Sequence, residues 1–527
     1  MKKVLFLLLA FYIQVSTFNS QLSTANAGGM MSNTNQNAAF IRNPARDAAI
    51  GIDGVYSNPA GVVLMPEGWH MSLNWQLAWQ RRIIDTQNPV LKYDANNGGN
   101  DTKHYRGIAT APFIPSVQLA YNWKKFSFQA SGAVSGGGGK CTFDTGLGSF
   151  DAAVGRVWAG LLSPVTTNLN NLFNTKYNLG VDVPMSTGYS SDAFMEGRQY
   201  YFGGTLGAAY KIVDAKNIKV SAYAGVRFLY GMAGYKAEIK NIKVNTTQGT
   251  QTLAEHFNSI SNSIYEAGVK AAMAGNMQAL QEITQTGEQL SQQSSQLAKY
   301  YNGVYLQSDQ NGFGVCPIIG LDVKYKWVNF AFKYEFRTKM NMTNSSTVDE
   351  AGLFPIVNQF VDGTSVREDT PALLTLGLQI EPIDGVRISG GYHHFYDRQA
   401  KKTYFDANGV RHDDKNQMLS SGTNEWLAGV EYDFGKDKRW TVSGGIQTTT
   451  YGNTDEYMTD LTFVTNSWSF GTGVKYKINE KMAVNVGYFQ TNYRDYEQAP
   501  EYRDGNGSNN KFTRRNRVFA AGLDIDL

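Results

Sequence analysis

From Trp69 onward, apolar and polar residues alternate along most of the chain, in paired runs joined by short polar turns. In one run, the apolar residues at positions 117, 119, 121 and 123 alternate with polar or small ones. A turn at Lys124-Lys125 then leads into a second alternating run that begins at Phe126. Alternation with a period of two gives a β-strand one apolar face. The pattern therefore predicts a series of β-hairpins.

The same unit recurs with short turns near residues 214–217, 326–327, 381–385, 435–438 and 479–481, and long polar loops separate the hairpins. With a first strand near 69–84 and a last strand near 513–527, the pattern predicts about fourteen strands. An even number of antiparallel strands, each with one apolar face, is typical of a transmembrane barrel. Only a closed barrel satisfies every backbone group in lipid. The regular alternation of tight and long connections favours this all-β barrel over a soluble β-sandwich.

Two of the long loops carry apolar residues at helical spacing. Residues 252–302 show two such stripes with a break at Gly275-Asn276, which predicts a helical hairpin. Residues 150–173 show one stripe, which predicts a helix kinked at Pro164. Whether these helices only cap the barrel or take part in ligand capture stays open at this point.

The first residues have the features of an export signal. Lys2 and Lys3 precede an apolar stretch from Val4 to about Val15, and Ala25-Asn26-Ala27 has the form of a cleavage site. We therefore predict a signal peptide over 1–27, a segment of 28–66 before the first strand, and a barrel over 67–527.

Composition agrees with a barrel and excludes several functions. The 527 residues are 13% aromatic and only 18% charged, and 54 are glycine. A net charge of +3 gives no electrostatic footprint for nucleic acid. Two cysteines are too few for a disulfide scaffold or a cysteine-based zinc site, although one bond between Cys141 and Cys316 remains open. We predict no metal and no cofactor.

Signals for catalysis are weak. Gly139-Lys140 resembles the end of a phosphate-binding loop, but Cys141 replaces the Ser or Thr that would hold magnesium. His393 and His394 are adjacent on a predicted strand, so their side chains point to opposite faces and cannot share one site. The chain is therefore not predicted to be an enzyme.

Four basic residues lie on the inward faces of predicted strands by alternation, and they are Arg227, Lys333, Arg337 and Arg387. Such side chains could bind the carboxylate of a ligand. Alternatively, they form ion pairs inside the lumen with Glu335, Asp322 or Glu431.

The most specific local signal precedes the barrel, where residues 38–64 are rich in Ala and Gly and contain Asn58-Pro59-Ala60. This segment resembles the N-terminal hatch of the FadL/TodX family of outer-membrane transporters for long-chain fatty acids and other hydrophobic compounds. The resemblance implies that residues 28–66 block the lumen of the barrel. A second copy, Asn43-Pro44-Ala45, lies farther from the first strand and is less well placed for the family's role.

The resemblance also implies a mechanism of passive uptake. Outer loops would capture the ligand, an interior pocket would hold it, and a bend in the third strand would release it sideways into the bilayer. The third strand begins at Phe126, and its Gly132, Gly136 and Gly137 are the candidates for that bend, because glycine weakens a ladder.

The expected partners are a hydrophobic small molecule, outer-membrane lipid, lipopolysaccharide and the barrel assembly machinery, with a monomer as the expected state. Two other functions stay open at this point: a diffusion porin for small polar solutes, and an outer-membrane lipid hydrolase.

Overall fold

A computed structural model describes residues 37–348, 359–406, 409–499 and 507–527. The predicted signal peptide, and the part of the predicted hatch before residue 37, lie outside the described residues.

The strands form one closed antiparallel barrel of fourteen strands, as the sequence pattern predicts. Closure occurs at β1, which pairs along one side with β2 and along the other with β20. Two of the fourteen barrel strands are each interrupted and consist of two segments. One consists of β8 and β9, which both pair with β7. The next consists of β10, which pairs with β9, and β11, which pairs with β8. The barrel strands are β1 Gly68–Gln87, β2 Thr102–Trp123, β3 Phe126–Phe143, β4 Ser186–Asp214, β5 Ile218–Thr246, β7 Val304–Tyr325, β8 Val328–Glu335 with β9 Asn341–Val348, β10 Ser365–Arg367 with β11 Leu373–Ile383, β12 Val386–Phe395, β15 Thr423–Phe434, β16 Trp440–Thr450, β17 Ser467–Lys477, β18 Met482–Tyr493 and β20 Asn509–Asp526.

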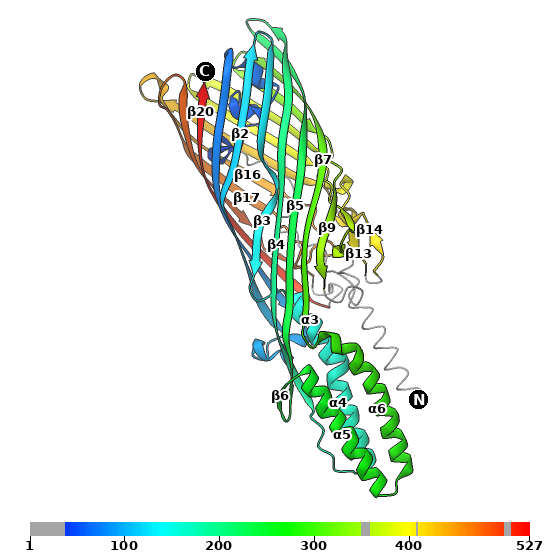
Figure 1. Cartoon of the computed structure of the whole chain (residues 1–527). Helices are drawn as coiled ribbons and strands as arrows, with labels where there is room; N and C mark the ends of the chain where they lie inside the picture. The colour runs from blue at the N-terminus through cyan, green and yellow to red at the C-terminus, as the bar shows by residue number, and fades with distance from the viewer. Residues whose placement is uncertain (1–36, 349–358, 407–408, 500–506) are drawn as a thin grey trace.

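The tight turns that join neighbouring barrel strands lie at one end of the barrel, together with the chain's C-terminus, at the top of Figure 1. Two of them are two-residue turns whose first residues, Lys124 and Lys326, have φ values of 54° and 49°. Positive φ is what a two-residue hairpin turn between right-twisted strands requires. By the rule for such barrels, this end faces the periplasm and the long loops face outward.

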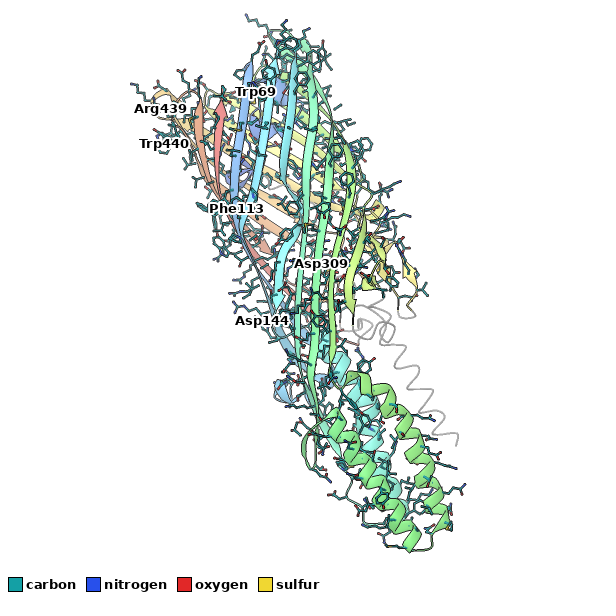
Figure 2. All side chains as sticks on the ribbon, viewed as in Figure 1. Trp69, Phe113, Asp144, Asp309, Arg439 and Trp440 are labelled. Carbon is teal, nitrogen blue, oxygen red and sulfur yellow. The ribbon has the colours of Figure 1, made fainter. Side chains whose placement is uncertain are left out.

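Exposed aromatic side chains mark the two edges of the membrane-spanning band. Trp69 and Trp79 on β1 are 54% and 45% exposed. The ten residue steps from one to the other span about 33 Å of strand, or about 23 Å of height at a tilt of about 45°. This height matches the apolar band of outer-membrane barrels, about 25 Å. Trp440 marks the same inner edge as Trp69, at the upper left of Figure 2.

β4 and β5 are 29 residues long, about three times what a tilted strand needs to span a bilayer. Because both begin or end at a tight turn on the periplasmic side, the excess length projects outward. The projecting ends carry a helical bundle at the bottom of Figure 1.

The bundle contains both predicted helical insertions. α3 Gly148–Val157 and α4 Ser163–Asn170 are joined and followed by π-helical turns, η5 Trp158–Leu162 and η6 Asn171–Lys176. Pro164 sits in the first turn of α4, where its missing N–H costs least. α5 Leu253–Met273 and α6 Met277–Leu297 form the predicted hairpin. Leu169 and Phe173 pack against Ile260 and Ile283 in a shared apolar core.

None of the helices in the described ranges is long and apolar enough to cross a membrane.

The predicted hatch folds back into the lumen near the periplasmic end, where Figure 1 shows it in dark blue. It contains α2 Ala38–Arg42 and the short helices η1 Ile52–Val55 and η2 Gly61–Leu64. Its backbone lies directly against wall glycines: a Cβ on Gly471 would meet the Ile41 carbonyl oxygen at 2.5 Å, and one on Gly377 would meet the Ala48 nitrogen at 2.5 Å. Glycine therefore makes room for the hatch on this side of the barrel.

The bundle core gives a direct test of this architecture. Ile260 is 1% exposed, whereas Tyr265 on the same helix is 76% exposed. We expect Ile260→Asp to open the bundle to limited proteolysis, because it places an unpaired charge in an apolar core at a cost of several kcal/mol. Tyr265→Asp serves as the matched control and should leave the cleavage pattern unchanged. Both variants should keep the heat-modifiable electrophoretic migration of a barrel, and loss of it in the first would show that bundle and barrel fold as one unit.

Candidate functional site

The tripeptide Asn58-Pro59-Ala60 fixes the hatch to three different strands. Asn58 Nδ2 donates to Asp322 Oδ2 on β7 at 2.7 Å. Gln129 Nε2 on β3 donates to the Pro59 carbonyl at 2.8 Å, and Ser221 Oγ on β5 donates to the Ala60 carbonyl at 2.6 Å. Because Pro59 fixes its own φ and restricts Asn58, the two carbonyls are held at defined angles.

Within the described residues, the side chain of Asn43 in the second copy of the tripeptide makes no hydrogen bond to the wall, although it packs against Gly429. Asn43 Oδ1 accepts the Ala45 backbone N–H at 3.1 Å, and its Nδ2 is buried without a hydrogen-bond partner among the described residues. Asn58 makes the equivalent local bond to the Gly61 N–H at 3.2 Å and adds the bond to a carboxylate. The structure therefore distinguishes the two copies by their contact with the wall.

A buried ionic network holds the other half of the hatch. Glu431 on β15 accepts Arg42 at 2.5 Å and Arg46 at 2.9 Å from the hatch, and Arg387 of the wall at 3.2 Å. Arg387 also pairs with Asp433 at 2.6 Å. For Arg387, the ion-pairing alternative is thus what the structure shows. Such a network holds a defined hatch position, because removal of one partner leaves a buried charge uncompensated.

Arg227 and Lys333 meet at Glu335. Arg227 Nη1 lies 2.5 Å from Glu335 Oε2, and Lys333 Nζ lies 2.9 Å from Glu335 Oε1. Lys333 also donates to the Tyr56 carbonyl of the hatch at 2.8 Å, and the Tyr56 ring lies against both cations. Two cations share one carboxylate here, so the cluster keeps a surplus positive charge at the outer face of the hatch.

Arg337 does not join this cluster. β8 ends at Glu335, so the alternation that would turn Arg337 inward beside Lys333 stops before it. Its guanidinium instead donates to the Gln399 carbonyl at 2.5 Å, in a loop at the outer mouth. The prediction of a lumen-facing Arg337 beside the other basic residues is corrected by this break in the strand.

Beyond the hatch, apolar side chains from the loops and the wall fill part of the lumen. The loop between β16 and β17, residues 451–466, turns inward and buries Met458, Leu461 and Phe463. They join wall residues in one continuous apolar cluster that includes four methionines, Met195, Met340, Met342 and Met458. Methionine is flexible and adapts to ligands of varied shape.

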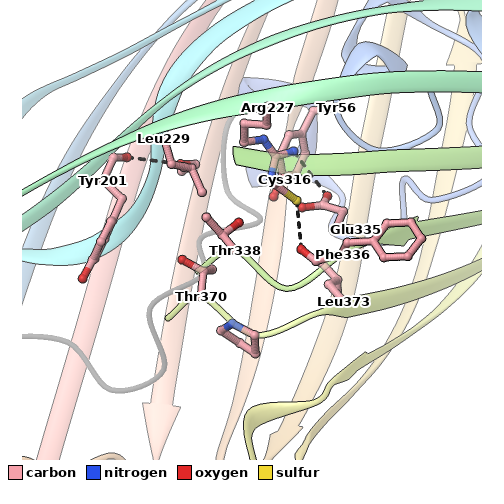
Figure 3. A pocket seen from close by; sticks show the side chains of 12 residues that line it. Tyr56, Tyr201, Arg227, Leu229, Cys316, Glu335, Phe336, Thr338, Thr370 and Leu373 are labelled. Atoms are coloured by element: carbon pink, nitrogen blue, oxygen red, sulfur yellow. Dashed lines mark hydrogen bonds and ion pairs between the residues drawn. The ribbon is translucent and has the colours of Figure 1, made fainter. Parts of the chain in front are cut away.

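A small cavity lies between this cluster and the hatch. Figure 3 shows Tyr201 and Leu229 on one side, Thr338 and Thr370 on the loop side, and the Arg227 to Glu335 pair next to Tyr56. The space left between these side chains is narrow, about that of a water molecule. The structure is thus a closed state, which must widen to admit an alkyl chain or an aromatic ring.

The barrel wall is interrupted beside this cavity. β2 and β3 pair from Trp123↔Phe126 to Ser116↔Ala133, and pairing resumes only at Ala109↔Cys141. Residues 110–115 and 134–140 between them make no ladder pairs with one another, and we call this interval the seam. Ser135, within the seam, also lines the cavity. The cavity therefore reaches the wall exactly where the ladder is open.

The predicted glycines differ in their relation to the seam. Gly136 and Gly137 lie inside it, at two bulges in the pairing of β3 with β4. Gly137 has φ of +98°, and a Cβ there would collide with the Gln199 carbonyl oxygen. Gly132 instead pairs regularly with Val117, and a Cβ there would meet only ordinary contacts. Gly132 is therefore outside the seam.

The other side of the seam is a feature that the sequence analysis missed. β2 carries Pro112 and Pro115 within it, and proline has no N–H to donate to a neighbouring strand. Phe113 between them is 68% exposed and lies on the outside of the barrel in Figure 2. A pair of prolines inside a long alternating run was the available signal for a break in pairing.

The remaining candidates are structural. Cys141 and Cys316 are both buried free thiols, so the open question of a disulfide is answered against one. His393 is held between Asp47 of the hatch at 3.0 Å and Glu425 of the wall at 2.8 Å. Among the described residues, no group of three or more His, Cys, Asp or Glu could hold a metal ion.

Solved structures share this fold. A Pseudomonas aeruginosa FadL homologue is 11% identical with a TM-score of 0.57, and the match covers 95% of this chain and 100% of that one. The Pseudomonas putida toluene transporter TodX is 11% identical with a TM-score of 0.51, over 94% of this chain and 99% of the other. A TodX mutant described as a monoaromatic hydrocarbon channel is 12% identical with a TM-score of 0.52, over the same shares of 94% and 99%. At these identities the likeness establishes the fold, which is the one that the hatch resemblance implied.

No protein-family model matches the chain, and a search of curated proteins finds no relative.

The two tripeptides provide a matched pair of variants. Asn58→Ala removes the 2.7 Å bond to Asp322, which should weaken hatch docking by about 1–3 kcal/mol because it leaves a buried carboxylate short of a donor. We expect this variant to show increased ion conductance in planar bilayers, because a loosened hatch admits water. Asn43→Ala loses only a local bond and should conduct like the parent. Equal conductance of the two variants would contradict the assignment of the lock to Asn58.

Proposed function

We propose that the protein takes up hydrophobic small molecules across the outer membrane, passively, and releases them sideways through the seam between β2 and β3. The observation that carries this proposal is the continuous apolar cluster in the outer lumen. Its members Ala109 and Cys141 form the outer boundary of the seam, and Ser135 links the seam to the cavity. If these side chains move apart, an apolar ligand would stay out of water between the loops and the wall.

The proteins that share this fold support a hydrophobic ligand for this chain. A toluene transporter and a monoaromatic hydrocarbon channel share this architecture. The first candidate for this chain is a long-chain fatty acid or a molecule like it, because the basic groups Arg227 and Lys333 stand beside the cavity with a surplus positive charge. A carboxylate is the natural partner for such a group.

Lateral release follows from the energetics of an apolar ligand. Each methylene that leaves water gains about 0.8 kcal/mol, so transfer from the cavity to the bilayer needs no energy source. Release into the periplasm would return the same surface to water. Capture begins at the projecting strands and helical bundle, which stand beyond the membrane surface where an amphiphile first meets the protein.

The two other candidate functions find less support. A diffusion porin has a polar, water-filled lumen, whereas this lumen is occupied by the hatch on one side and by inward-turned apolar loops on the other. For a lipid hydrolase, the buried His393 would have to activate a nucleophile, but both of its ring nitrogens are engaged by carboxylates.

Reversible stapling of the seam tests the exit. Ala109→Cys faces the native Cys141 at the outer boundary, and Ser116→Cys with Ala133→Cys face each other at the inner one. We expect oxidation of this triple variant to abolish uptake of labelled oleate by cells, because the seam can no longer widen. A reductant should restore uptake, and binding of oleate to the oxidised protein should persist.

A staple elsewhere in the wall controls for stiffening of the barrel. Ala428→Cys and Ile446→Cys face each other across β15 and β16, in a Cys141→Ser background. This variant should transport equally well oxidised and reduced. Normal transport by the oxidised seam variant would instead point to passage through a displaced hatch.

A further inference from the structure

Three charged side chains meet in the outer mouth of the barrel, away from the hatch. Glu368 follows β10, and Lys402 and Lys415 belong to the loop of residues 396–422 between β12 and β15. Their exposures are 1%, 6% and 3%. The backbone is fixed around them, because Glu368 and Lys402 form a β-bridge and the Lys415 N–H donates to the Lys402 carbonyl at 3.1 Å.

These charges are close but incompletely paired. Lys402 Nζ lies 3.9 Å from Glu368 Oε1, which is beyond hydrogen-bond distance. Within the described residues, neither Lys415 Nζ nor either carboxylate oxygen of Glu368 has a hydrogen-bond partner. Burial of a charge without partners costs several kcal/mol, so the arrangement has capacity for a further group.

Neighbouring acids do not supply that group. Asp369 is saturated by Arg367 at 2.6 Å and by the backbone N–H groups of Met340 and Lys401. Asp397 accepts the Thr423 N–H at 2.7 Å, and burial raises its pKa to about 7, which disfavours its charged form near neutrality. Two amine side chains therefore lie beside the single carboxyl group of Glu368, and burial raises the pKa of that carboxyl.

The cluster adjoins apolar space on the route inward. Thr370 and Pro371, directly after Asp369, line the cavity, and Figure 3 labels Thr370 on its loop side. Tyr457 places its ring 5.4 Å from Lys415 Nζ, and the next residue, Met458, belongs to the apolar cluster of the outer lumen. A molecule bound here would thus have a charged end between lysines and an apolar end against methionine and aromatic side chains.

We propose that Lys402 and Lys415 form a binding site for the anionic headgroup, a carboxylate or an oxyanion of similar size, of an amphiphilic ligand that enters the barrel. This inference rests on the proposed function and adds to it the selection of amphiphilic acids over neutral hydrocarbons. The site is distinct from the cluster at Arg227, which lies on the hatch side of the cavity. An acid would meet this outer site first and the hatch-side cations second.

Burial disfavours the charged form of the two lysines while no anion lies between them. Burial lowers the pKa of both side chains, and the nearby charge of Lys402 lowers the pKa of Lys415 further. An anion between them stabilises the charged form of each, so its binding is reinforced by the groups that it contacts.

The test compares two ligands of equal chain length, oleate and oleyl alcohol, which differ only in the headgroup. In the double variant Lys402→Met with Lys415→Met, uptake of oleate should fall at least about tenfold, as expected for loss of charge-assisted bonds, while uptake of oleyl alcohol stays within about twofold of the parent. The matched control is Lys401→Met, because Lys401 is adjacent in sequence and exposed. It should transport both ligands normally.

A second variant protects the test against misfolding of the first. Glu368→Gln keeps the side-chain volume and removes the one carboxylate at the site. Binding of oleate to this purified variant should tighten by at least about threefold, and binding of oleyl alcohol should not change. Acetate is included as a competitor, and it should displace oleate only weakly because it lacks the apolar chain.

Four outcomes would overturn the inference. An equal loss of uptake of both ligands in the double variant would show that the lysines only stabilise the structure of the loops. Unchanged oleate uptake in the double variant, or unchanged oleate affinity in Glu368→Gln, would contradict the inference of a headgroup site and would leave the proposed function intact. If acetate displaced bound oleate as strongly as unlabelled oleate does, the two lysines would form a site for small anions only. Absence of uptake of either ligand by the parent protein would refute the proposed function itself, and with it this inference.

Discussion

The hydrogen-bond ladder that closes β1 onto both β2 and β20 is the constraint on which the rest of the structure depends. In lipid no water can satisfy a free backbone group, so a spanning sheet must have no edge. Once closed, the wall places every second side chain in the lumen, and the contents of the lumen follow from those residues. An interruption of the ladder inside such a wall is costly. The seam between β2 and β3 coincides with Pro112 and Pro115, which lack a backbone N–H, on one strand and with Gly137, at a φ of +98°, on the other.

The lumen is divided into two halves of different chemistry. On the periplasmic side, wall glycines let the hatch backbone approach closely, and ions and amides such as Glu431, Asp322 and Gln129 hold it in one position. On the outer side, the loops contribute a methionine-rich apolar cluster beside hydrogen-bonded groups such as Asp369 and Asp397. A polar network specifies a single arrangement, whereas a methionine-rich core tolerates repacking. The rigid half is therefore suited to block the channel, and the adaptable half is suited to hold ligands.

Much of the fold was predictable, because period-two alternation and short turns are local signals. The same holds for the helical hairpin around Gly275 and for the tripeptide at Asn58, which carries its own turn geometry. What the sequence could not predict depends on where alternation stops. Arg337 follows the end of β8, so its side chain no longer continues the inward-facing positions of that strand. Gly132 is paired regularly with β2, although glycine weakens a ladder. The inward turn of residues 451–466 and the meeting of Lys402 with Glu368 depend on contacts distant in sequence, for which no periodicity exists.

The same contacts decide between the two exits from the cavity. Passage through the hatch would require separation of Arg42 and Arg46 from Glu431 and of Asn58 from Asp322, each of which leaves a buried charge uncompensated. Passage through the seam requires no ladder bond between its two strands to break at the start, since residues 110–115 and 134–140 are already unpaired with one another. Gln129 of β3 donates to the Pro59 carbonyl just before the seam begins. The docked hatch therefore holds β3 in position at one edge of the seam. A fixed hatch and the proposed lateral exit thus fit one arrangement: the hatch that fills the inner lumen also holds the strand beside which an apolar ligand would leave.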